Sequence, residues 1–312
     1  MNPTDKLQWI INEEDDGLRL DVFLTDQTDF SRSYIQKLLK NGHICLDGRI
    51  ATKSGQQVCA GSVIEMSVPE PEEITLKPEP MELNIVYEDD DVILIDKPKG
   101  MVVHPAPGHP DHTLVNGLLE HCHNRLSGIN GILRPGIVHR IDRDTTGILI
   151  ACKNDIAHRS LAEQFASHSI TRRYQAIVYN NFKEEEGTID HAIARNPSDR
   201  KKMCVVPEEK GRHAVTHYRV LDHLNHRFNH IECRLETGRT HQIRVHMAYI
   251  HHPLLGDDVY GPGSVSGFSN LEGQTLHAGI LGFVHPRTHQ YMEFKSELPP
   301  YFVDLLNQLK NC

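Results

Sequence analysis

Hydrophobic residues at helical spacing define one short segment near the start of the chain. Ile35, Leu38 and Leu39 follow the i, i+3, i+4 pattern of a helix that buries one face. Ser31 is a plausible N-cap for this helix, and Gly42 is a plausible left-handed residue at its C-terminal end. The pattern therefore predicts a helix between residues 31 and 42.

The residues after this helix alternate like short strands. Residues 43–46 predict a strand, Asp47-Gly48 is a pair typical of a tight hairpin turn, and residues 63–68 predict a closing strand. Lys37 and Lys40 would project from the side of the helix opposite its buried stripe. These elements predict a small α+β module with a basic helix–hairpin face. A polar face that only contacts solvent is the alternative on composition alone.

The rest of the chain is rich in short β-like runs. Strands are predicted at residues 92–95, 148–151, 174–179 and 230–235. The spacing of Ile243, Met247 and Ile250 predicts a helix over residues 240–250, and a last helix is predicted over residues 302–309. Because strands and helices do not alternate strictly, we do not expect a doubly wound parallel sheet.

An acidic, proline-rich stretch separates these two regions. Residues 65–91 hold ten acidic residues against a single base, Lys77, and four prolines lie between residues 69 and 80. Proline disfavours helices and removes a donor from sheet ladders. The stretch therefore predicts an extended linker, with a domain boundary near residues 70–80.

Composition and charge narrow the class of protein. The 312 residues contain 33 Lys and Arg against 42 Asp and Glu, and the formal net charge is −9. This charge excludes a uniformly basic, histone-like nucleic-acid binder but not a local basic patch. The seven cysteines form no CxxC pair, and the chain has no signal-peptide layout and no apolar run near the roughly 20 residues of a membrane helix. We therefore expect a cytoplasmic protein with reduced thiols.

Several chemistries are excluded because their motifs are missing. The chain contains no GxxxxGK[ST] phosphate loop, no HExxH, no GxGxxG and no GxSxG. The 22 histidines raise the question of a metal, and residues 121–123 and 251–252 are the best candidates. Adjacent histidines on a strand point to opposite faces, and no second ligand pair lies at zinc-finger spacing. No metal site is expected.

The segment GIVHRIDRDTTG, residues 136–147, is the strongest candidate for chemistry. It places Asp142 between Arg140 and Arg143 on a turn rich in threonine and glycine, directly before the apolar run ILIA. Neighbouring guanidinium groups keep a carboxylate ionised, which is the state that a carboxylate nucleophile requires. A structural Arg–Asp network in a turn is the alternative interpretation.

Two further clusters place arginine where anions bind or bases stack. LETGRTHQIRVH, residues 235–246, runs from a strand into the start of a helix, where Arg239 and Arg244 could bind phosphate or pair with Asp142. RRY, residues 172–174, places Tyr174 beside two cations. Such a ring can stack on a base, although core packing and helix capping are the ordinary roles of these residue types.

Together and in this order, these segments resemble the RluA-type family of pseudouridine synthases. HRIDRDTTG, RRYQA and GRTHQIRVHM match three family motifs, with Ile141 where leucine is usual. IDKPKGMVVHP resembles the opening motif, with Asp96 where asparagine is common. LRLDVFL and SRSYIQKLLKNGHICLDG resemble an S4 RNA-binding domain. We therefore expect an S4-like domain over residues 17–68, the acidic linker over 69–82 and a catalytic domain over 83–312.

The resemblance also implies the fold and the reaction. The expected fold is α+β, with a pseudouridine-synthase domain on a mixed, mainly antiparallel central sheet and a small α+β S4-like N-terminal domain. The expected reaction detaches the base of a uridine in RNA, rotates it and rejoins it through carbon, without a cofactor or a metal. The target uridine has to leave its stack, so base flipping is expected.

By motif matching, the resemblance implies a role for each site residue. Asp142 would be the essential carboxylate, which either attacks the ribose or assists cleavage of the glycosidic bond; both routes stay open. Arg140 would occupy the gap left by the flipped base, Tyr174 would stack on that base, and Arg244 would form an ion pair with Asp142.

The S4-like domain favours large-subunit ribosomal RNA, or its assembly precursors, as the partner. Arg32, Lys37 and Lys40 are expected to contact RNA phosphates, and a monomer without membrane contact is expected. Residues 103–119 and 215–223 look most like the large-subunit synthase D type, with the C type as the alternative.

Two alternatives belong to other classes of protein. A non-catalytic RNA-binding protein of ribosome assembly could keep the motifs, although it would not need Asp142. A carboxylate glycosidase would require a second acid on the same sugar, and Asp144 is the only nearby candidate.

Overall fold

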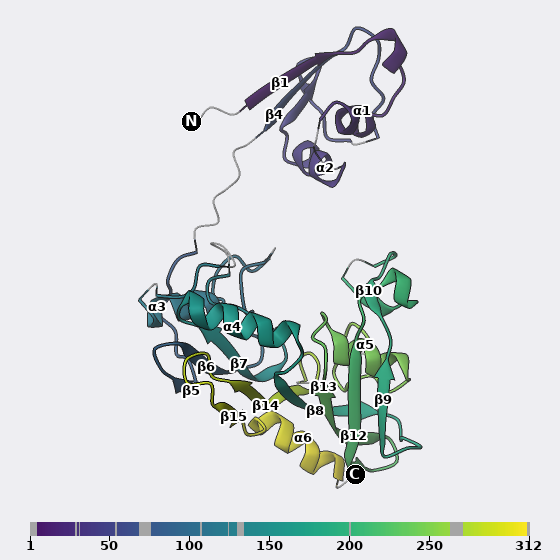
Figure 1. Ribbon diagram of the computed structural model, residues 1–312. Helices are drawn as coiled ribbons and strands as arrows, with labels where there is room; N and C mark the ends of the chain where they lie inside the picture. Colours follow the sequence, from purple (N-terminus) through teal and green to yellow (C-terminus); the bar gives the residue numbers. More distant parts are fainter. Residues whose placement is uncertain are drawn as a thin grey trace. The chain divides into compact units, whose positions relative to one another are not determined.

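The chain divides into two compact units, Met1–Ile74 and Thr75–Cys312 (Figure 1). The computed structural model describes residues 5–28, 30, 32–53, 55–68, 76–106, 108–123, 125–129, 134–199, 201–262 and 271–310. Residues 69–75 of the predicted linker and the predicted N-cap Ser31 lie outside the described residues.

The smaller unit is a four-stranded sheet with two helices. Its elements are β1 (Asp5–Ile10), the 3-10 helix η1 (Glu13–Asp15), α1 (Leu20–Asp26), α2 (Arg32–Lys40), β2 (Ile44–Leu46), β3 (Arg49–Ile50) and β4 (Val63–Val68). The strands pair antiparallel in the order β1-β4-β2-β3. The α+β fold expected for this part of the chain is confirmed.

Helix α2 carries the predicted buried stripe. Ile35, Leu38 and Leu39 are all buried in the core of the unit. The helix ends as predicted at Gly42, whose φ is +75°. The N–H groups of Gly42 and His43 donate to the carbonyls of Leu39 (3.1 Å) and Leu38 (3.0 Å), which satisfies two carbonyls that the helix leaves open.

The predicted hairpin and closing strand are also confirmed. Asp47 and Gly48 both have positive φ, 50° and 73°, and join β2 to β3 in a turn that follows the right-handed twist of the strands. Strand β4 spans the predicted residues. Strand β1 was not predicted; it pairs with β4 along its whole length.

The larger unit is built on one nine-stranded sheet. Its elements are β5 (Ile85–Glu88), β6 (Val92–Lys97), α3 (Leu114–His121), β7 (Thr146–Cys152), α4 (Asp155–Ala166), β8 (Thr171–Tyr179), β9 (Glu186–Asp190), β10 (Ile193–Arg195), β11 (Met203–Val205), the 3-10 helix η2 (Glu208–Lys210), β12 (Val215–Leu224), β13 (Phe228–Leu235), α5 (Gln242–Tyr249), β14 (Leu276–Val284), β15 (Tyr291–Lys295) and α6 (Pro300–Lys310). The sheet order is β5-β6-β7-β14-β8-β13-β12-β9, and β15 pairs with β14.

The pairing in this sheet is mixed and mainly antiparallel, as expected. Strands β7 and β14 form the parallel pair, and the other neighbours in the sheet run antiparallel. Strand β14 lies between β7 and β8, although it follows them by about a hundred residues in the chain. This insertion places the end of the HRIDRDTTG segment beside residues from the last quarter of the chain.

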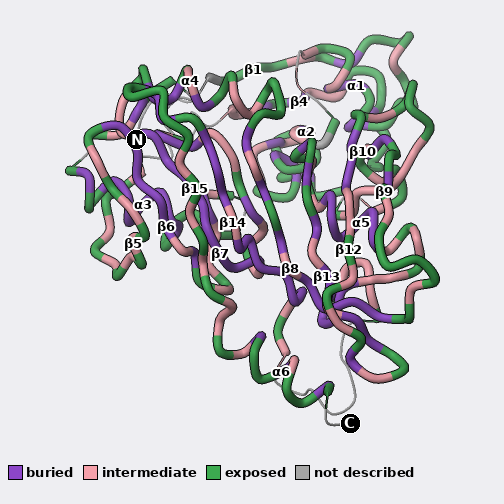
Figure 2. Tube along the Cα trace, turned by 60° about the horizontal axis from the view of Figure 1, so that its bottom comes forward, coloured by how far each residue is buried: buried purple, intermediate pink, exposed green. Residues whose placement is uncertain are grey.

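The central strands are covered on both faces. Along β6, Ile93 and Ile95 join the main core beneath α3 and α5, whereas Val92 and Leu94 join a second core beneath α4. Figure 2 shows these central strands as a continuous buried layer. Burial on both faces accounts for the unbroken apolar run of β7, all of whose residues are buried.

Residues 77–79, which the sequence placed in the linker, pack on the larger unit. The side-chain amide of Asn116 on α3 donates to the carbonyl of Lys77 (2.8 Å), and the N–H of Glu79 donates to the carbonyl of Asn116 (3.0 Å).

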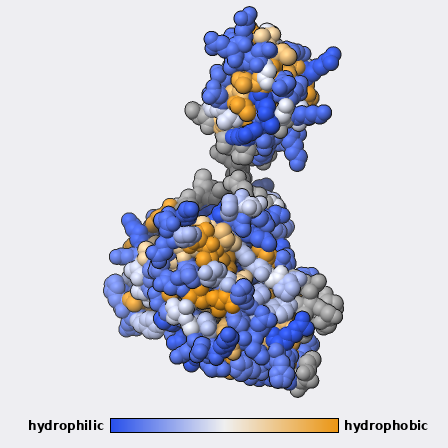
Figure 3. Space-filling view, turned by 90° about the vertical axis from the view of Figure 1, so that its right-hand side faces the viewer, coloured by the Kyte–Doolittle hydropathy of each residue, from blue (hydrophilic) through white to orange (hydrophobic). Residues whose placement is uncertain are grey.

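In the part of the chain that the structure describes, no helix has the length and apolar character needed to cross a membrane. In Figure 3, the face in view is mostly hydrophilic, with apolar side chains gathered near the middle of the larger unit.

Candidate active site

The loop that carries Asp142 is held by a buried lysine. Lys97, at the end of β6, has no exposed surface, and its Nζ donates to the carbonyls of Pro98 (2.9 Å), Met101 (3.0 Å) and Arg143 (2.8 Å). Burial lowers the pKa of Lys97 to about 7, against the opposing attraction of the acids of the loop. These three hydrogen bonds fix the backbone immediately after Asp142.

Gly147 allows the strand behind this loop to approach β14 closely. Its φ is +108°, and a Cβ atom at this position would lie 2.2 Å from the carbonyl oxygen of Ala278. A side chain is therefore excluded on two grounds, backbone conformation and space. Ile141, next to Asp142, is buried in the main core and anchors the other side of the loop.

The structure pairs Asp142 with Arg244, not with the arginines that flank it in sequence. Arg244 Nη1 on α5 donates to Asp142 Oδ2 at 3.0 Å. Arg143 instead makes two 3.0 Å bonds to Asp144, and Arg140 Nη1 lies 3.4 Å from His104 Nε2. The expectation that neighbouring guanidinium groups frame Asp142 is therefore wrong in detail, because the partner is 102 residues away in sequence.

A second carboxylate, Asp257, holds Arg244 from behind. Arg244 Nε and Nη2 donate to Asp257 at 2.7 and 2.9 Å, and the Asp257 side chain has no exposed surface. Burial by itself would raise the pKa of Asp257, but the hydrogen bonds and charge of Arg244 outweigh burial and lower it. Sequence reasoning missed Asp257, because nothing in the local text LLGDDVYG separates a buried acid from an exposed one.

Asp142 lines a cleft of about 680 Å³ in the larger unit. Asp142, Arg140 and Tyr174 all face it, and a smaller recess of about 60 Å³ is lined by these three together with Arg244. Tyr174 is buried, and burial raises the pKa of its hydroxyl, so the phenol is neutral at physiological pH. The predicted residues Asp142, Arg140, Tyr174 and Arg244 thus meet at one place.

The cleft is rich in arginine. Its lining includes five arginines, Arg134, Arg140, Arg172, Arg212 and Arg239. Within the described part of the chain, none of these five lies within ion-pair distance of a carboxylate. Arg172 is buried, its Nη2 donates to the Glu236 carbonyl (2.9 Å), and its Nε has no partner among the described residues. A cleft of this kind suits a polyanion.

Comparison with known proteins identifies the family to which the chain belongs. A model of the RNA pseudouridylate synthase family matches residues 91–249, and a model of the S4 domain matches residues 18–64. The chain belongs to the RNA pseudouridylate synthase family. It is an RNA pseudouridine synthase, an isomerase, with an S4 domain at its N-terminal end.

The relatives of this pseudouridine synthase match nearly its full length. It is 49% identical over 300 residues to an uncharacterized RNA pseudouridine synthase of Bacillus subtilis, with 96% of each chain covered. It is 44% identical over 299 residues to ribosomal large subunit pseudouridine synthase D of Zymomonas mobilis, with 94% of each chain covered. The solved structure of human RNA pseudouridylate synthase domain containing 1 shares its fold, with a TM-score of 0.57 and 24% identity over 78% of this chain and 98% of that one.

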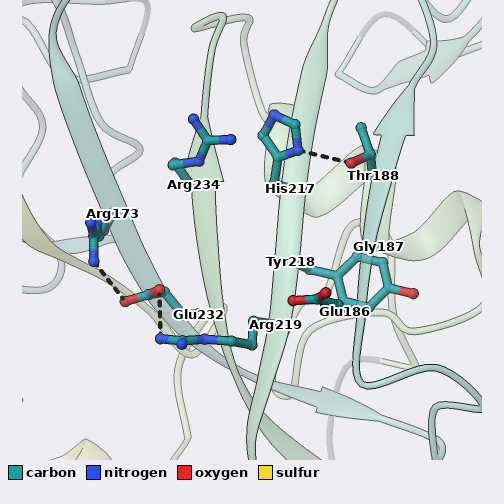
Figure 4. Close-up of a pocket in the computed structure, with 9 residues that line it drawn as sticks. All are labelled: Arg173, Glu186, Gly187, Thr188, His217, Tyr218, Arg219, Glu232 and Arg234. Atoms are coloured by element: carbon teal, nitrogen blue, oxygen red, sulfur yellow. Dashed lines mark hydrogen bonds and ion pairs between the residues drawn. The ribbon is translucent and has the colours of Figure 1, made fainter.

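A second cavity of the pseudouridine synthase, of about 550 Å³, lies on the opposite face of the same strands. Side chains alternate along β8, so Arg173 points away from the cleft that Tyr174 lines. Figure 4 shows Glu232 between Arg173 and Arg219, at 4.0 and 3.2 Å. The arginines of this cavity are thus partly neutralised, unlike those of the cleft.

One cluster in the synthase has the composition of a metal site. Among the described residues, Asp89, Asp91 and His285 bring three possible ligand atoms within 4.8 Å of one another. Arg287 donates two 2.6 Å hydrogen bonds to Asp91, and His285 already contacts Asp89 at 2.8 Å. The cluster is therefore an ion-pair network between the start of β6 and the turn after β14.

The S4 unit presents the predicted basic residues unequally. Arg32 donates to Asp21 (2.9 Å), a buried acid that Arg19 also contacts. Burial favours the neutral form of Asp21, but the hydrogen bonds from these arginines outweigh burial and hold its pKa at about 2. Lys37 and Lys40 are exposed on α2. Arg32 therefore has a structural bond as well as a half-exposed surface, whereas both lysines are open to solvent.

Proposed function

We propose that this enzyme isomerises uridine to pseudouridine in large-subunit ribosomal RNA, with Asp142 as the catalytic carboxylate. The observation that carries the proposal is the Asp142–Arg244 ion pair, set where an arginine-lined cleft meets its small recess. A carboxylate held in its charged form suits attack on an electrophilic ribose carbon, and unpaired arginines suit an RNA backbone. Relatives from Zymomonas mobilis and Haemophilus influenzae, 44% and 40% identical and named ribosomal large subunit pseudouridine synthase D, support this target.

In the proposed reaction, the bond between ribose C1′ and uracil N1 breaks and a bond between C1′ and C5 forms. The proton on C5 leaves and N1 gains one, so the product is an isomer of the substrate and no redox partner is needed. Asp142 either attacks C1′ or assists departure of the base. Arg140, exposed at the mouth of the cleft, fills the space left by the flipped uridine, and Tyr174 stacks on its ring.

We assign substrate docking to the S4-like domain over residues 17–68 and chemistry to residues 83–312. Arg32, Lys37 and Lys40 contact RNA phosphates, which position the RNA without reading its bases. The enzyme works as a cytoplasmic monomer on the ribosomal RNA or on its assembly precursors. The D type is the assignment that the named relatives support, and the C type is the alternative.

The test compares pseudouridine maps of large-subunit ribosomal RNA from cells with and without the gene. Specific pseudouridines should disappear on deletion and return with the wild-type protein, but not with Asp142→Asn. Asp144→Asn should restore them, because the Asp144 carboxylate pairs with Arg143 and does not line the cleft. An unchanged map after deletion would refute large-subunit ribosomal RNA as the substrate. Restoration by Asp142→Asn would refute the assignment of the catalytic carboxylate.

A further inference from the structure

Asp142 presents its two carboxylate oxygens to two different groups. Oδ2 accepts from Arg244, whereas Oδ1 lies 3.7 Å from Nε2 of His241. This second distance is just beyond hydrogen-bond range, so a small movement of the ring would close it. His241 has left-handed backbone angles, with φ of +56°, directly before α5 begins, and only 20% of its side chain is exposed.

The other side of the His241 ring is held by a tyrosine. Tyr260 Oη lies 2.8 Å from His241 Nδ1 and accepts the N–H of Met203 at 2.7 Å. With one acceptor position of the hydroxyl already used, its proton can be donated to Nδ1. A neutral imidazole that accepts at Nδ1 carries its proton on Nε2, the atom that faces Asp142. The reverse tautomer would direct a lone pair at a carboxylate.

One buried carboxylate, Asp257, helps to position both groups that face Asp142, Arg244 and His241. Asp257 binds Arg244 through two hydrogen bonds, and its Oδ1 also accepts from the N–H groups of Val259 (2.9 Å) and Tyr260 (3.0 Å). The Tyr260 ring lies 5.2 Å from the Arg244 guanidinium carbon. Asp257 therefore holds Arg244, which donates to Oδ2 of Asp142. It also holds the backbone of Tyr260, whose hydroxyl contacts His241, the residue that faces Oδ1.

We propose that His241 is a positioning residue for the reaction, which donates from Nε2 to Asp142 Oδ1 in the tautomer set by Tyr260. The proposal rests on the assignment of Asp142 as the catalytic carboxylate. With a donor on each oxygen, the carboxylate is fixed in rotation. The substrate is the same RNA uridine as in the proposed function. His241 and Tyr260 orient the Asp142 carboxylate toward the flipped nucleoside.

The charges around His241 agree with a neutral ring. It is faced by Asp142 and Asp257, by Arg244 and Arg140, and by the Tyr260 hydroxyl. Burial is the largest influence and lowers the pKa of His241, while Asp142 acts in the opposite direction. A neutral ring with the proton on Nε2 satisfies both the tyrosine and the carboxylate.

Two substitutions separate this relay from general packing. Tyr260→Phe removes only the hydroxyl and keeps the ring beside Arg244. His241→Asn removes both ring contacts with a residue that tolerates left-handed backbone angles. Tyr249→Phe is the matched control, because Tyr249 is exposed near the end of α5 and lies outside the cleft.

The assay is single-turnover pseudouridine formation on transcribed, unmodified large-subunit ribosomal RNA, with saturating enzyme, from pH 5 to pH 9. Loss of one hydrogen bond to the reacting group should slow each single variant about tenfold, with the RNA dissociation constant unchanged. The double variant should be no slower than the slower single variant, because the tyrosine acts through the histidine.

Each other outcome decides between the proposals. Multiplicative effects in the double variant would refute the relay, and wild-type rates in both single variants would refute the positioning role. Thermal unfolding identifies a misfolded His241→Asn, in which case Tyr260→Phe alone still tests the fall in rate at an unchanged RNA dissociation constant. Asp142→Asn is run in the same series. If it retains activity, the proposed function fails; if it is inactive while the His241 and Tyr260 variants match the wild type, only this inference fails.

Discussion

Replacing Asp257 with asparagine should destabilise the larger unit strongly. Asp257 has no exposed surface and accepts four hydrogen bonds, two from Arg244 and two from backbone N–H groups. Asparagine keeps the shape but removes the charge, so the guanidinium group of Arg244, only 6% exposed, loses its buried partner. Breaking a buried pair on one side costs about 3–5 kcal/mol. For a unit of this size, that is a fall in melting temperature of about 6–20 °C.

The assay is thermal unfolding followed by circular dichroism, with Asp258→Asn as the matched control. Asp258 is the next residue in the chain and is exposed, so removal of its charge should change stability by less than about 0.5 kcal/mol. The single-turnover rate of Asp257→Asn should fall as well, because Arg244 and Tyr260 both lose their anchor. A melting temperature equal to that of the control would refute the reasoning.

The stability that Asp257 contributes should depend on pH in a defined direction. The pKa of Asp257 is lowered in the folded state, so its contribution to stability is complete above the unfolded value of roughly 4. That contribution is lost as the pH falls through the folded pKa, because the proton then binds the folded state too. The difference in stability between the wild type and Asp257→Asn should therefore be largest near neutral pH and should narrow below pH of about 4. A gap that widens in acid would contradict the assigned charge state.

Other predictions follow from the same structure. Lys37→Gln with Lys40→Gln should raise KM for long ribosomal fragments and reduce the slope of log binding constant against log salt concentration by roughly 0.7 per lost contact on single strands, with the saturated rate unchanged; a collapse of that rate would contradict the division of labour. Gly147→Ala should cost at least about 2 kcal/mol in urea unfolding, because the new methyl group meets a backbone carbonyl; a wild-type midpoint would count against the close approach. Lys97→Met should lower stability by about 3 kcal/mol and slow turnover, since three backbone carbonyls lose their donor; unchanged unfolding would show that water replaces it. Dialysis against a chelator should leave activity on a prefolded short RNA unchanged, and recovery only with stoichiometric zinc would overturn this expectation.

Local sequence determined the elements whose hydrogen bonds close over a few residues. The stripe of Ile35, Leu38 and Leu39 predicted α2, and its end at Gly42 and the Asp47-Gly48 turn followed from backbone angles that few residues adopt. The sequence motifs also indicated the family and the reaction, because several long segments matched in order. Local backbone patterns and the order of the motifs can both be read directly from the amino-acid sequence.

Tertiary structure decided which groups meet. Sequence neighbours suggested Arg140 and Arg143 as partners of Asp142, and the pairing with Arg244 was expected only from the family resemblance. The fold brings Arg244 on α5 to the carboxylate from 102 residues away. Three other features depend on strand order and on close approach between distant segments. They are the burial of Asp257, the hydrogen bonds from Lys97 to three backbone carbonyls, and the contact between Tyr260 and His241. Strand pairing is non-local, and whether an acid is buried depends on the elements that cover it, so neither could be predicted from the residues that surround it in the chain.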